Sequence, residues 1–364
     1  MIQEKGSVAS VYRSHHRPIV CLYCCSCNSF YIFVKVINNQ TNLSSKQIIV
    51  NDPVYGFITI KCPLVFEIVD HPFFQRLRRI KQLGLTYLVF PSALHTRFQH
   101  ALGAVHLMQE SLNVLISKGV KVSSEEYEAA CLAILLHDVG HGPFSHALER
   151  SIIENVDHEN LSLIIMEYLN KEYDGRLALT IKIYTRKYER AFFHQLISSQ
   201  LDVDRLDYLH RDSFFTSVAE GVIGVERIIK MMCVKNDRIV FEKKGIYSIE
   251  NFLIARRSMY WQVYLHKTVL AAEHILLKIL LRAKEVYKVG KGLFLTTPLR
   301  YFFDNEIDLQ RISNDDKVLE YFMSLDDHDV ITCIKEWMRH EDRTLAFLCK
   351  SIISRELLRI EISD

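Results

Sequence analysis

The feature that most constrains the fold is a run of apolar residues that ends in a His-Asp pair. Residues 129–136 are all apolar, and His137 and Asp138 follow directly. Ser123 and Glu126 before the run have the spacing of a capping box, which begins a helix. A buried strand is the alternative for such a run, but the preceding cap and the alanines disfavour it. We therefore predict a fully buried helix that ends at this pair.

The rest of the chain also favours helices. Only 13 Gly and 7 Pro among 364 residues exclude a collagen-like or long disordered chain, and they favour long helices over a sandwich with many turns. The expected structure is mainly α, with minor short strands and a helical C-terminal region. Apolar periodicity and capping patterns predict helices at about 72–84, 96–119, 123–136, 144–155, 159–172, 189–212, 249–287 and 316–325, and short strands at 57–60 and 357–362.

The charge and the N-terminal residues exclude some classes of function. Lys+Arg 45 against Asp+Glu 43 argues against a polybasic partner surface, although a local basic cleft is compatible with it. Residues 19–34 are apolar but short for a membrane anchor, and polar residues interrupt them. Cys21, Cys24, Cys25 and Cys27 lack the second pair that a zinc site requires. We treat residues 1–47 as an extension outside the functional argument, and the singly scattered cysteines elsewhere favour a reducing, cytoplasmic location.

The His-Asp pair becomes informative through its surroundings. A second pair, His328-Asp329, lies in the acidic run 326–329, which we interpret as a solvated surface turn. By contrast, an imidazole and a carboxylate at the end of a buried helix are costly unless they are paired or bind a metal. Such ligands suit Fe, Mn, Co, Ni or Zn, and Mg suits a more oxygen-rich position.

Other ligands must come from elsewhere in the chain. His100 on the preceding helix is one candidate. Asp204, Tyr208 and Asp212 form a stripe at i, i+4 and i+8 of a later helix. Alone, such a stripe is equally consistent with a solvated face.

Several basic and aromatic side chains could bind phosphate and a base. Arg offers forked donors for phosphate oxygens, and Tyr can stack on a base or bond a sugar. Each pattern is weak alone, because exposed Arg is mostly solvated and helical Tyr mostly packs in the core. The candidates are the basic run Arg76, Arg78, Arg79 and Lys81, then Arg97, and the stripe Arg256, Tyr260 and Tyr264.

Taken together, these segments resemble the HD-domain superfamily of metal-dependent phosphohydrolases. The resemblance is closest to its dNTP triphosphohydrolases, which include the vertebrate SAM-and-HD-domain enzyme and its bacterial relatives, and it runs from about residue 48 to the C-terminus. It implies an HD-domain helical bundle at 48–290 and a C-terminal helical region at 291–364 that is shorter than in relatives. The matching motifs are Asn51-Asp52-Pro53, residues 74–84, Phe90-Pro91, residues 95–103, residues 137–146, Asp157-His158-Glu159 and residues 202–208.

The resemblance also implies a reaction and a role for each residue. It assigns a divalent metal (Fe, Mn, Zn, Ni or Co) to four ligands, with Mg or Mn on the substrate phosphates, and hydrolysis of a dNTP at the α-phosphate to deoxynucleoside and triphosphate. The ligands would be His100, His137, Asp138 and Asp204. His146 would be the general acid, His141 and His158 would contact phosphates or relay protons, and Asp202 would orient the water. Arg97, Arg205 and Arg256 would bind phosphates, Gln82, Tyr208 and Asp212 would read the 3′-hydroxyl, and Leu83 with Tyr264 would crowd the 2′ position.

The residues that relatives use for regulation and assembly are less completely matched in this sequence. Some members bind a guanine nucleotide, dGTP or GTP, as an activator, and Asp70, Gln75 and Arg78 match its reading residues. Ile48, Cys233, Glu242 and Leu265 depart from the family pattern at or near nucleotide contacts, which puts this activation in doubt. By analogy we expect a homo-oligomer, either a dimer or a tetramer.

Two alternatives stay open. One is an HD phosphohydrolase or phosphodiesterase for another nucleotide. The other is a non-catalytic regulator that binds nucleotides or single-stranded nucleic acid, which the intact ligand set disfavours. We expect no membrane association.

Overall fold

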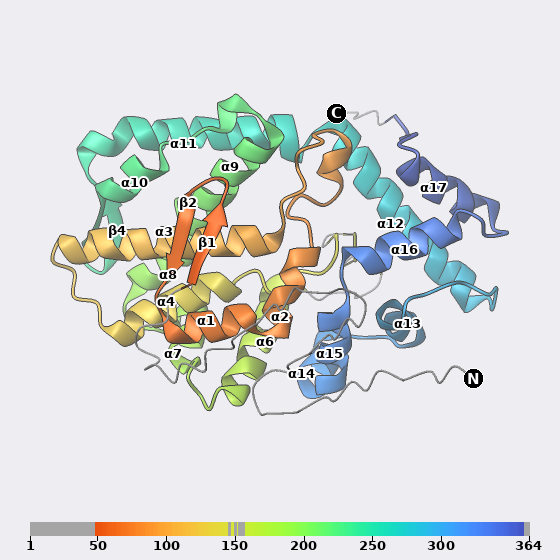
Figure 1. Cartoon of the computed structure of the whole chain (residues 1–364), viewed down its shortest axis with the longest axis horizontal. Coiled ribbons are helices and arrows are strands. Elements are labelled where there is room, and N and C mark those ends of the chain that lie inside the picture. Colours follow the sequence, from red (N-terminus) through yellow and green to blue (C-terminus); the bar gives the residue numbers. More distant parts are fainter. Residues whose placement is uncertain (1–47, 145–146, 149–150, 152–156, 360–364) are drawn as a thin grey trace, which may run out of the picture. The chain divides into compact units, whose positions relative to one another are not determined.

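The computed structural model describes residues 48–144, 147–148, 151 and 157–359 (Figure 1). The apolar residues 19–34 and the clustered cysteines lie outside these ranges, as does most of the helix expected at 144–155. Within the described ranges, no helix is both long enough and apolar enough to cross a membrane.

The prediction of a mainly α fold with minor strands is confirmed. The described strands form two antiparallel hairpins, β1 (Ile48–Asp52) with β2 (Gly56–Ile60), and β3 (Met232–Lys235) with β4 (Arg238–Phe241). In the first hairpin, Asp52 Oδ1 accepts hydrogen bonds from the backbone of Val54 and Tyr55, and this turns the chain. Asn236 and Asp237 have positive φ angles between β3 and β4, as tight hairpin turns require.

Helices make up most of the remaining described chain. Those up to residue 216 are α1 (Pro63–Asp70), α2 (Pro72–Gln75), η2 (Arg76–Arg79), η3 (Gly84–Leu88), α3 (Arg97–Ser117), α4 (Ser124–Leu136), α6 (His158–Glu172), α7 (Ala178–Tyr184), α8 (Ala191–Ile197) and α9 (Val203–Thr216). The later ones are η4 (Ala219–Gly221), α10 (Val225–Met231), η5 (Lys243–Gly245), α11 (Ile246–Met259), the π-helix η6 (Tyr260–Tyr264), α12 (Lys267–Lys288), α13 (Thr297–Asp304), α14 (Leu309–Asn314), α15 (Asp316–Ser324), α16 (Asp327–Trp337) and α17 (Arg343–Ile353).

Helix α4 lies in the core and positions the His-Asp pair. Its last eight residues, 129–136, are buried, and it packs against α3, which in turn packs against α9. The capping box of Ser123 and Glu126 is present, as expected from the sequence. Thr96 and Gln99 form a second capping box at the start of α3. These caps fix where the two helices begin, and therefore which residues reach their ends.

Three expected helices are interrupted. The segment 72–84 ends its helical part at Arg79, because the backbone around Lys81 pairs with the segment around Thr96 instead. The segment 189–212 divides into α8 and α9, since Asp202 caps a new helix. The segment 249–287 divides into α11, η6 and α12. The expected strand at 357–362 is absent from its described part, 357–359, which has no regular structure.

The acidic run 326–329 was wrongly interpreted as a solvated turn. Asp326 and Asp327 are buried and begin α16, where Asp326 forms a capping box. Asp326 also binds the Arg79 guanidinium, and Asp327 accepts a hydrogen bond from the Lys81 backbone at 3.0 Å. The Lys81 Nζ atom also lies 3.5 Å from Asp327 Oδ2, so the C-terminal region pairs with two of the four cations that the sequence had offered for phosphate binding.

Candidate metal centre

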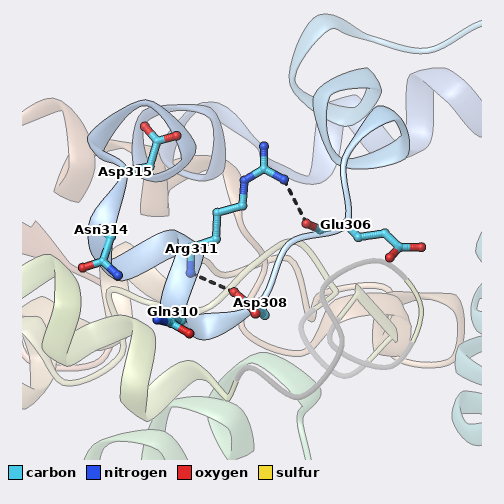
Figure 2. A pocket seen from close by; sticks show the side chains of 6 residues that line it. All are labelled: Glu306, Asp308, Gln310, Arg311, Asn314 and Asp315. Atoms are coloured by element: carbon cyan, nitrogen blue, oxygen red, sulfur yellow. Dashed lines mark hydrogen bonds between the residues drawn. The ribbon is translucent and has the colours of Figure 1, made fainter.

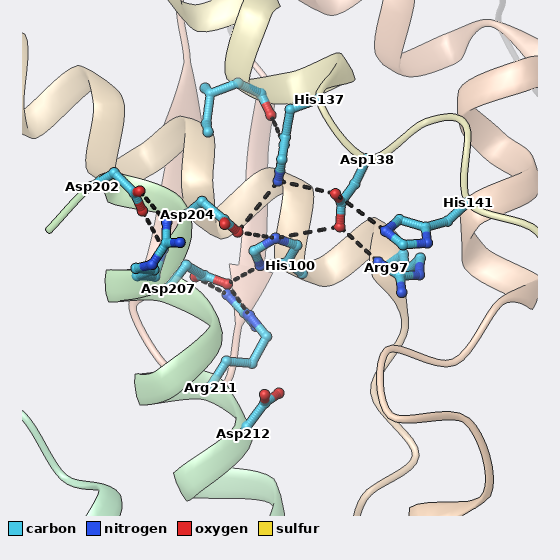
Figure 3. A network of polar contacts seen from close by, with 12 residues as sticks. Arg97, His100, His137, Asp138, His141, Asp202, Asp204, Asp207, Arg211 and Asp212 are labelled. Atoms are coloured by element: carbon cyan, nitrogen blue, oxygen red, sulfur yellow. Dashed lines mark hydrogen bonds and ion pairs between the residues drawn. The ribbon is translucent and has the colours of Figure 1, made fainter. Parts of the chain in front are cut away.

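Four side chains from three helices converge at one point (Figure 3). His100 comes from α3, His137 caps the end of α4, Asp138 follows it, and Asp204 lies in the first turn of α9. The distance to Asp204 Oδ1 is 3.1 Å from His100 Nε2 and 3.3 Å from His137 Nε2. Asp138 Oδ1 lies 3.3 Å from His137 Nε2. One ligand atom each from His100, His137 and Asp204 lies within 4.8 Å of the others.

The two imidazoles are oriented as metal ligands. His100 Nδ1 lies 2.7 Å from Asp207 Oδ2, and His137 Nδ1 lies 2.6 Å from the Ile134 carbonyl oxygen. Both acceptors require a proton on Nδ1, so we infer that the Nε2 lone pairs point to the centre. Buried His100 Nε2 makes no hydrogen bond within the described part of the chain. The donor set therefore fits a divalent cation.

The electrostatics of the cluster also favour a cation. Burial lowers the pKa of His100, but the carboxylates of Asp204 and Asp207 outweigh it and raise that pKa to about 10. Burial raises the pKa of Asp204, but the adjacent imidazoles of His100 and His137 hold it well below its ordinary value. Two carboxylates therefore face buried imidazoles, and their negative charge is one that a bound cation would balance.

A buried ion-pair network contacts His100 at Nδ1, the ring atom that faces away from the cluster. Asp207 receives two hydrogen bonds from Arg211, at 2.9 and 3.0 Å, in addition to its contact with His100. Arg211 Nη1 donates to Asp52 Oδ2 at 2.8 Å, which connects the β1–β2 turn to α9. The sequence analysis assigned no role to Asp207 or Arg211. Their positions one and two turns after Asp204, on a helix expected to be functional, were the signal that could have identified them.

Three of the residues expected to contact phosphates, Arg97, His141 and His158, lie on the Asp138 side of this cluster. Arg97 Nη1 lies 2.6 Å from Asp138 Oδ2, and His141 Nε2 lies 3.4 Å from Asp138 Oδ1. The rings of His141 and His158 stack at 3.9 Å. Burial and the nearby Arg97 lower the pKa of His141 to about 3. The expected general acid, His146, lies outside the described residues.

Asp202 and Arg205 lie together at the start of α9. Asp202 accepts hydrogen bonds from the backbone of Ser199 at 2.7 Å and of Arg205 at 2.8 Å, and it also binds the Arg205 guanidinium. Burial and the charge of Asp204 raise the pKa of Asp202 to about 6.

Two of the residues expected to recognise the sugar, Tyr208 and Asp212, lie further along α9, and Tyr264 of η6 reaches them. Asp212 is buried, and its Oδ2 accepts a hydrogen bond from the Tyr264 hydroxyl at 2.7 Å. The rings of Tyr208 and Tyr264 meet edge to face at 6.2 Å. Gln82 and Leu83 are half-buried. Arg256 lies over the Tyr260 ring at 5.8 Å, and no contact with the four-residue cluster is recorded for it among the described residues.

The expected activator residues are only partly brought together. Arg78 Nε donates to Gln75 Oε1 at 2.8 Å, and its guanidinium stacks on Phe98. Asp70 is exposed at the end of α1. Arg76, which was offered for phosphate binding, is fully buried and instead donates to the carbonyl oxygens of Leu325 at 2.7 Å and His141 at 3.0 Å.

A surface pocket beside α14 is separate from this cluster (Figure 2). Arg311, its only arginine, donates to the Glu306 carbonyl oxygen at 3.1 Å. Its lining residues are Glu306, Asp308, Gln310, Arg311, Asn314 and Asp315.

Comparison with known proteins identifies the region that carries the cluster. Residues 97–212 match the HD domain, and residues 223–291 match the HD associated region. The chain is 34% identical over 322 residues to the uncharacterized protein YwfO of Bacillus subtilis, which covers 86% of this chain and 72% of that protein. It is 29% identical over 289 residues to the human deoxynucleoside triphosphate triphosphohydrolase SAMHD1, which covers 67% of this chain but only 46% of the human protein.

A solved structure is also similar. A phosphohydrolase from Bacteroides thetaiotaomicron superposes with a TM-score of 0.85 at 53% identity, over 87% of this chain and 78% of that one.

Proposed function

Because the chain belongs to the HD-domain family of phosphohydrolases, we propose that it hydrolyses deoxynucleoside triphosphates at the α-phosphate and releases deoxynucleoside and triphosphate. One observation supports this choice of substrate. Asp204 of the metal cluster and Asp212, which binds Tyr264, share one face of α9, about 12 Å apart along the axis. A substrate with its α-phosphate at the cluster and its 3′-hydroxyl at Asp212 would lie along this face.

In this proposal His100, His137, Asp138 and Asp204 hold a divalent metal. When bound, the metal supplies Lewis-acid polarisation of a phosphate oxygen and favours deprotonation of water. Arg97 and Arg205 bring positive charge to the phosphates, and they hold the triphosphate group in line for attack by water.

Proton transfer is assigned to other side chains of the site. Asp202 orients the attacking water. His141 and His158, whose rings stack, contact the phosphates and relay the proton that the water releases. His146 donates a proton to the departing 5′-oxygen.

The proposal also covers recognition of the sugar, activation and oligomeric state. Gln82, Tyr208 and Asp212 bind the 3′-hydroxyl, while Leu83 and Tyr264 leave no room for a 2′-hydroxyl. A human relative named as a deoxynucleoside triphosphate triphosphohydrolase supports this choice of substrate. Activation by a guanine nucleotide, a homo-oligomer and a cytoplasmic location stay predictions.

The test is a product assay with each dNTP and Mn²⁺ or Mg²⁺. We expect inorganic triphosphate and deoxynucleoside in equal amounts. The Asp138→Asn variant should be inactive, and Asp316→Asn, which changes an exposed aspartate on α15, should be fully active. Release of pyrophosphate or single phosphates would contradict the proposed reaction and favour an HD phosphohydrolase of a different substrate class.

A further inference from the structure

His95 is a fully buried histidine at the sugar side of the proposed site. It lies just before α3, and its side chain has no exposed surface. Its Nε2 lies 2.7 Å from Asp212 Oδ1, and its ring stacks on Phe215 with a centroid distance of 4.4 Å. The sequence analysis gave this residue no role. Its position, 117 residues before Asp212, explains why the pairing was not foreseen.

Asp212 connects His95 to Tyr264. The carboxylate accepts from His95 through Oδ1 and from the Tyr264 hydroxyl through Oδ2, both at 2.7 Å. An ionised carboxylate is only an acceptor, so His95 must donate from Nε2. Each carboxylate oxygen has a second lone pair, which leaves Asp212 able to accept from a substrate hydroxyl as well.

The backbone of His95 is fixed by the same site. Its carbonyl oxygen accepts a hydrogen bond from the backbone of Gln82 at 2.9 Å. The Oε1 atom of Gln82 is buried and makes no hydrogen bond within the described ranges. His95, Gln82, Asp212 and Tyr264 are thus joined through direct hydrogen bonds, and three of them are residues expected to recognise the sugar.

We propose that His95 is a positioning residue for deoxyribose recognition, because its hydrogen bond fixes the Asp212 carboxylate and, through it, the Tyr264 hydroxyl. The inference rests on the proposed function, which assigns Asp212 and Tyr264 to the sugar. Without His95, Asp212 Oδ1 loses its donor and the carboxylate can rotate. The Tyr264 ring then loses its fixed position against the 2′ carbon.

A positioning role differs from a purely structural one in its effect on selectivity. A structural histidine would weaken the binding of every nucleotide by the same factor when it is replaced. A residue that acts through Asp212 and Tyr264 changes the discrimination between sugars. The informative quantities are therefore two ratios of association constants, that of dATP to that of ATP and that of dATP to that of 2′,3′-dideoxy-ATP.

The experiment compares His95→Leu with His95→Gln. Glutamine carries an amide donor at about the reach of Nε2, whereas leucine has none. Dissociation constants for dATP, ATP and 2′,3′-dideoxy-ATP are measured calorimetrically with Ca²⁺, and triphosphate release is measured separately with Mn²⁺. We expect both ratios to fall about tenfold or more in His95→Leu, the size expected for a lost hydrogen bond to a charged group, and to be largely kept in His95→Gln.

Two results would overturn this inference. One is an equal weakening of the binding of all three nucleotides in His95→Leu, and the other is no change in any of the three dissociation constants. Tyr264→Phe keeps the ring but removes the hydroxyl that binds Asp212, so it should also lose discrimination. Unchanged ratios in Tyr264→Phe would overturn the inference even if His95→Leu did not fold.

The proposed function is tested independently in the same samples. Wild-type protein that releases no triphosphate from any dNTP would refute the proposed function, while the calorimetric ratios would still report on His95. Wild-type protein that binds the three nucleotides equally well would overturn the role of His95, whatever its turnover.

Discussion

Substitution of Gly103 by alanine should disrupt the support behind His100. Gly103 lies in α3 where this helix faces α9. A Cβ atom at this position would stand 2.0 Å from Asp207 Oδ1 and 2.1 Å from Arg211 Nη2. Neither side chain can move freely, because both are buried and joined to each other by two hydrogen bonds. The methyl group must therefore separate the helices or break the ion pair.

The sign of the effect follows from two opposing free energies. Alanine in place of glycine inside a helix stabilises the folded state by about 1 kcal/mol. Breaking a buried ion pair costs about 3–5 kcal/mol, since it leaves charges without partners. We therefore expect Gly103→Ala to lower the free energy of unfolding by about 2–4 kcal/mol. Metal affinity should fall about 10- to 100-fold, because His100 loses the fixed Asp207 that orients its ring.

The assay is urea unfolding followed by far-UV circular dichroism, with metal content measured after dialysis. Gly292→Ala is the matched control, since no heavy atom lies within 4 Å of its added Cβ and its φ angle is not positive. The control should change the free energy of unfolding by less than about 0.5 kcal/mol. If Gly103→Ala matched or exceeded wild-type stability and kept its metal, α3 and α9 would not pack this closely and the argument would be wrong.

Three further predictions address the same region. Asp138→Asn should lower the amount of bound divalent metal at least about tenfold on elemental analysis, because it removes the charge of one carboxylate of the cluster. Its circular dichroism spectrum should match that of the wild type. An unchanged metal content would place the site elsewhere. Gly140→Ala should lower activity and stability together, measured by turnover and melting temperature, since its Cβ would lie 2.5 Å from the His158 carbonyl oxygen; wild-type values would show that this loop is free to move. Burial raises the pKa of Glu126, but hydrogen bonds from Ser123, Tyr188 and Arg190 lower it overall. Its stabilising contribution is therefore complete above the ordinary pKa of 4.5 and is lost as the pH falls through the lower folded value. In urea unfolding Glu126→Gln should be less stable than wild type at pH 7, by a difference that shrinks below about pH 4.5, and a constant difference would refute this.

Local rules predicted the elements that carry the metal cluster. Ser123 and Glu126 predict the capping box before α4, and Thr96 predicts where α3 begins, so the helix that carries His100 and the helix that ends at His137 are both visible in the sequence. The i, i+4, i+8 spacing along α9 predicted a shared face for Asp204, Tyr208 and Asp212. These predictions depend only on residues a few positions apart, for which helix geometry is known in advance.

Long-range pairing of charges could not be predicted in the same way. Arg79 and Lys81 looked like free cations because their partners, Asp326 and Asp327, lie about 246 residues later. The acidic run looked solvated for the same reason. A charged side chain is buried only when a partner reaches it, and a sequence gives the charge but not the partner. Composition therefore could not separate the arginine held inside the protein from the arginine available to phosphate.

The same reasoning indicates which arginines the substrate can still use. Arg76 has no exposed surface and is held by the carbonyl oxygens of Leu325 and His141, so it orders the His141 loop and cannot reach a ligand without unfolding. Arg97 contacts Asp138 of the cluster, Arg205 contacts Asp202 beside it, and both arginine side chains remain partly exposed. In the proposed function these are the two arginines placed to bind the substrate phosphates. The arginines proposed to bind phosphate are therefore those beside the cluster whose side chains stay partly exposed.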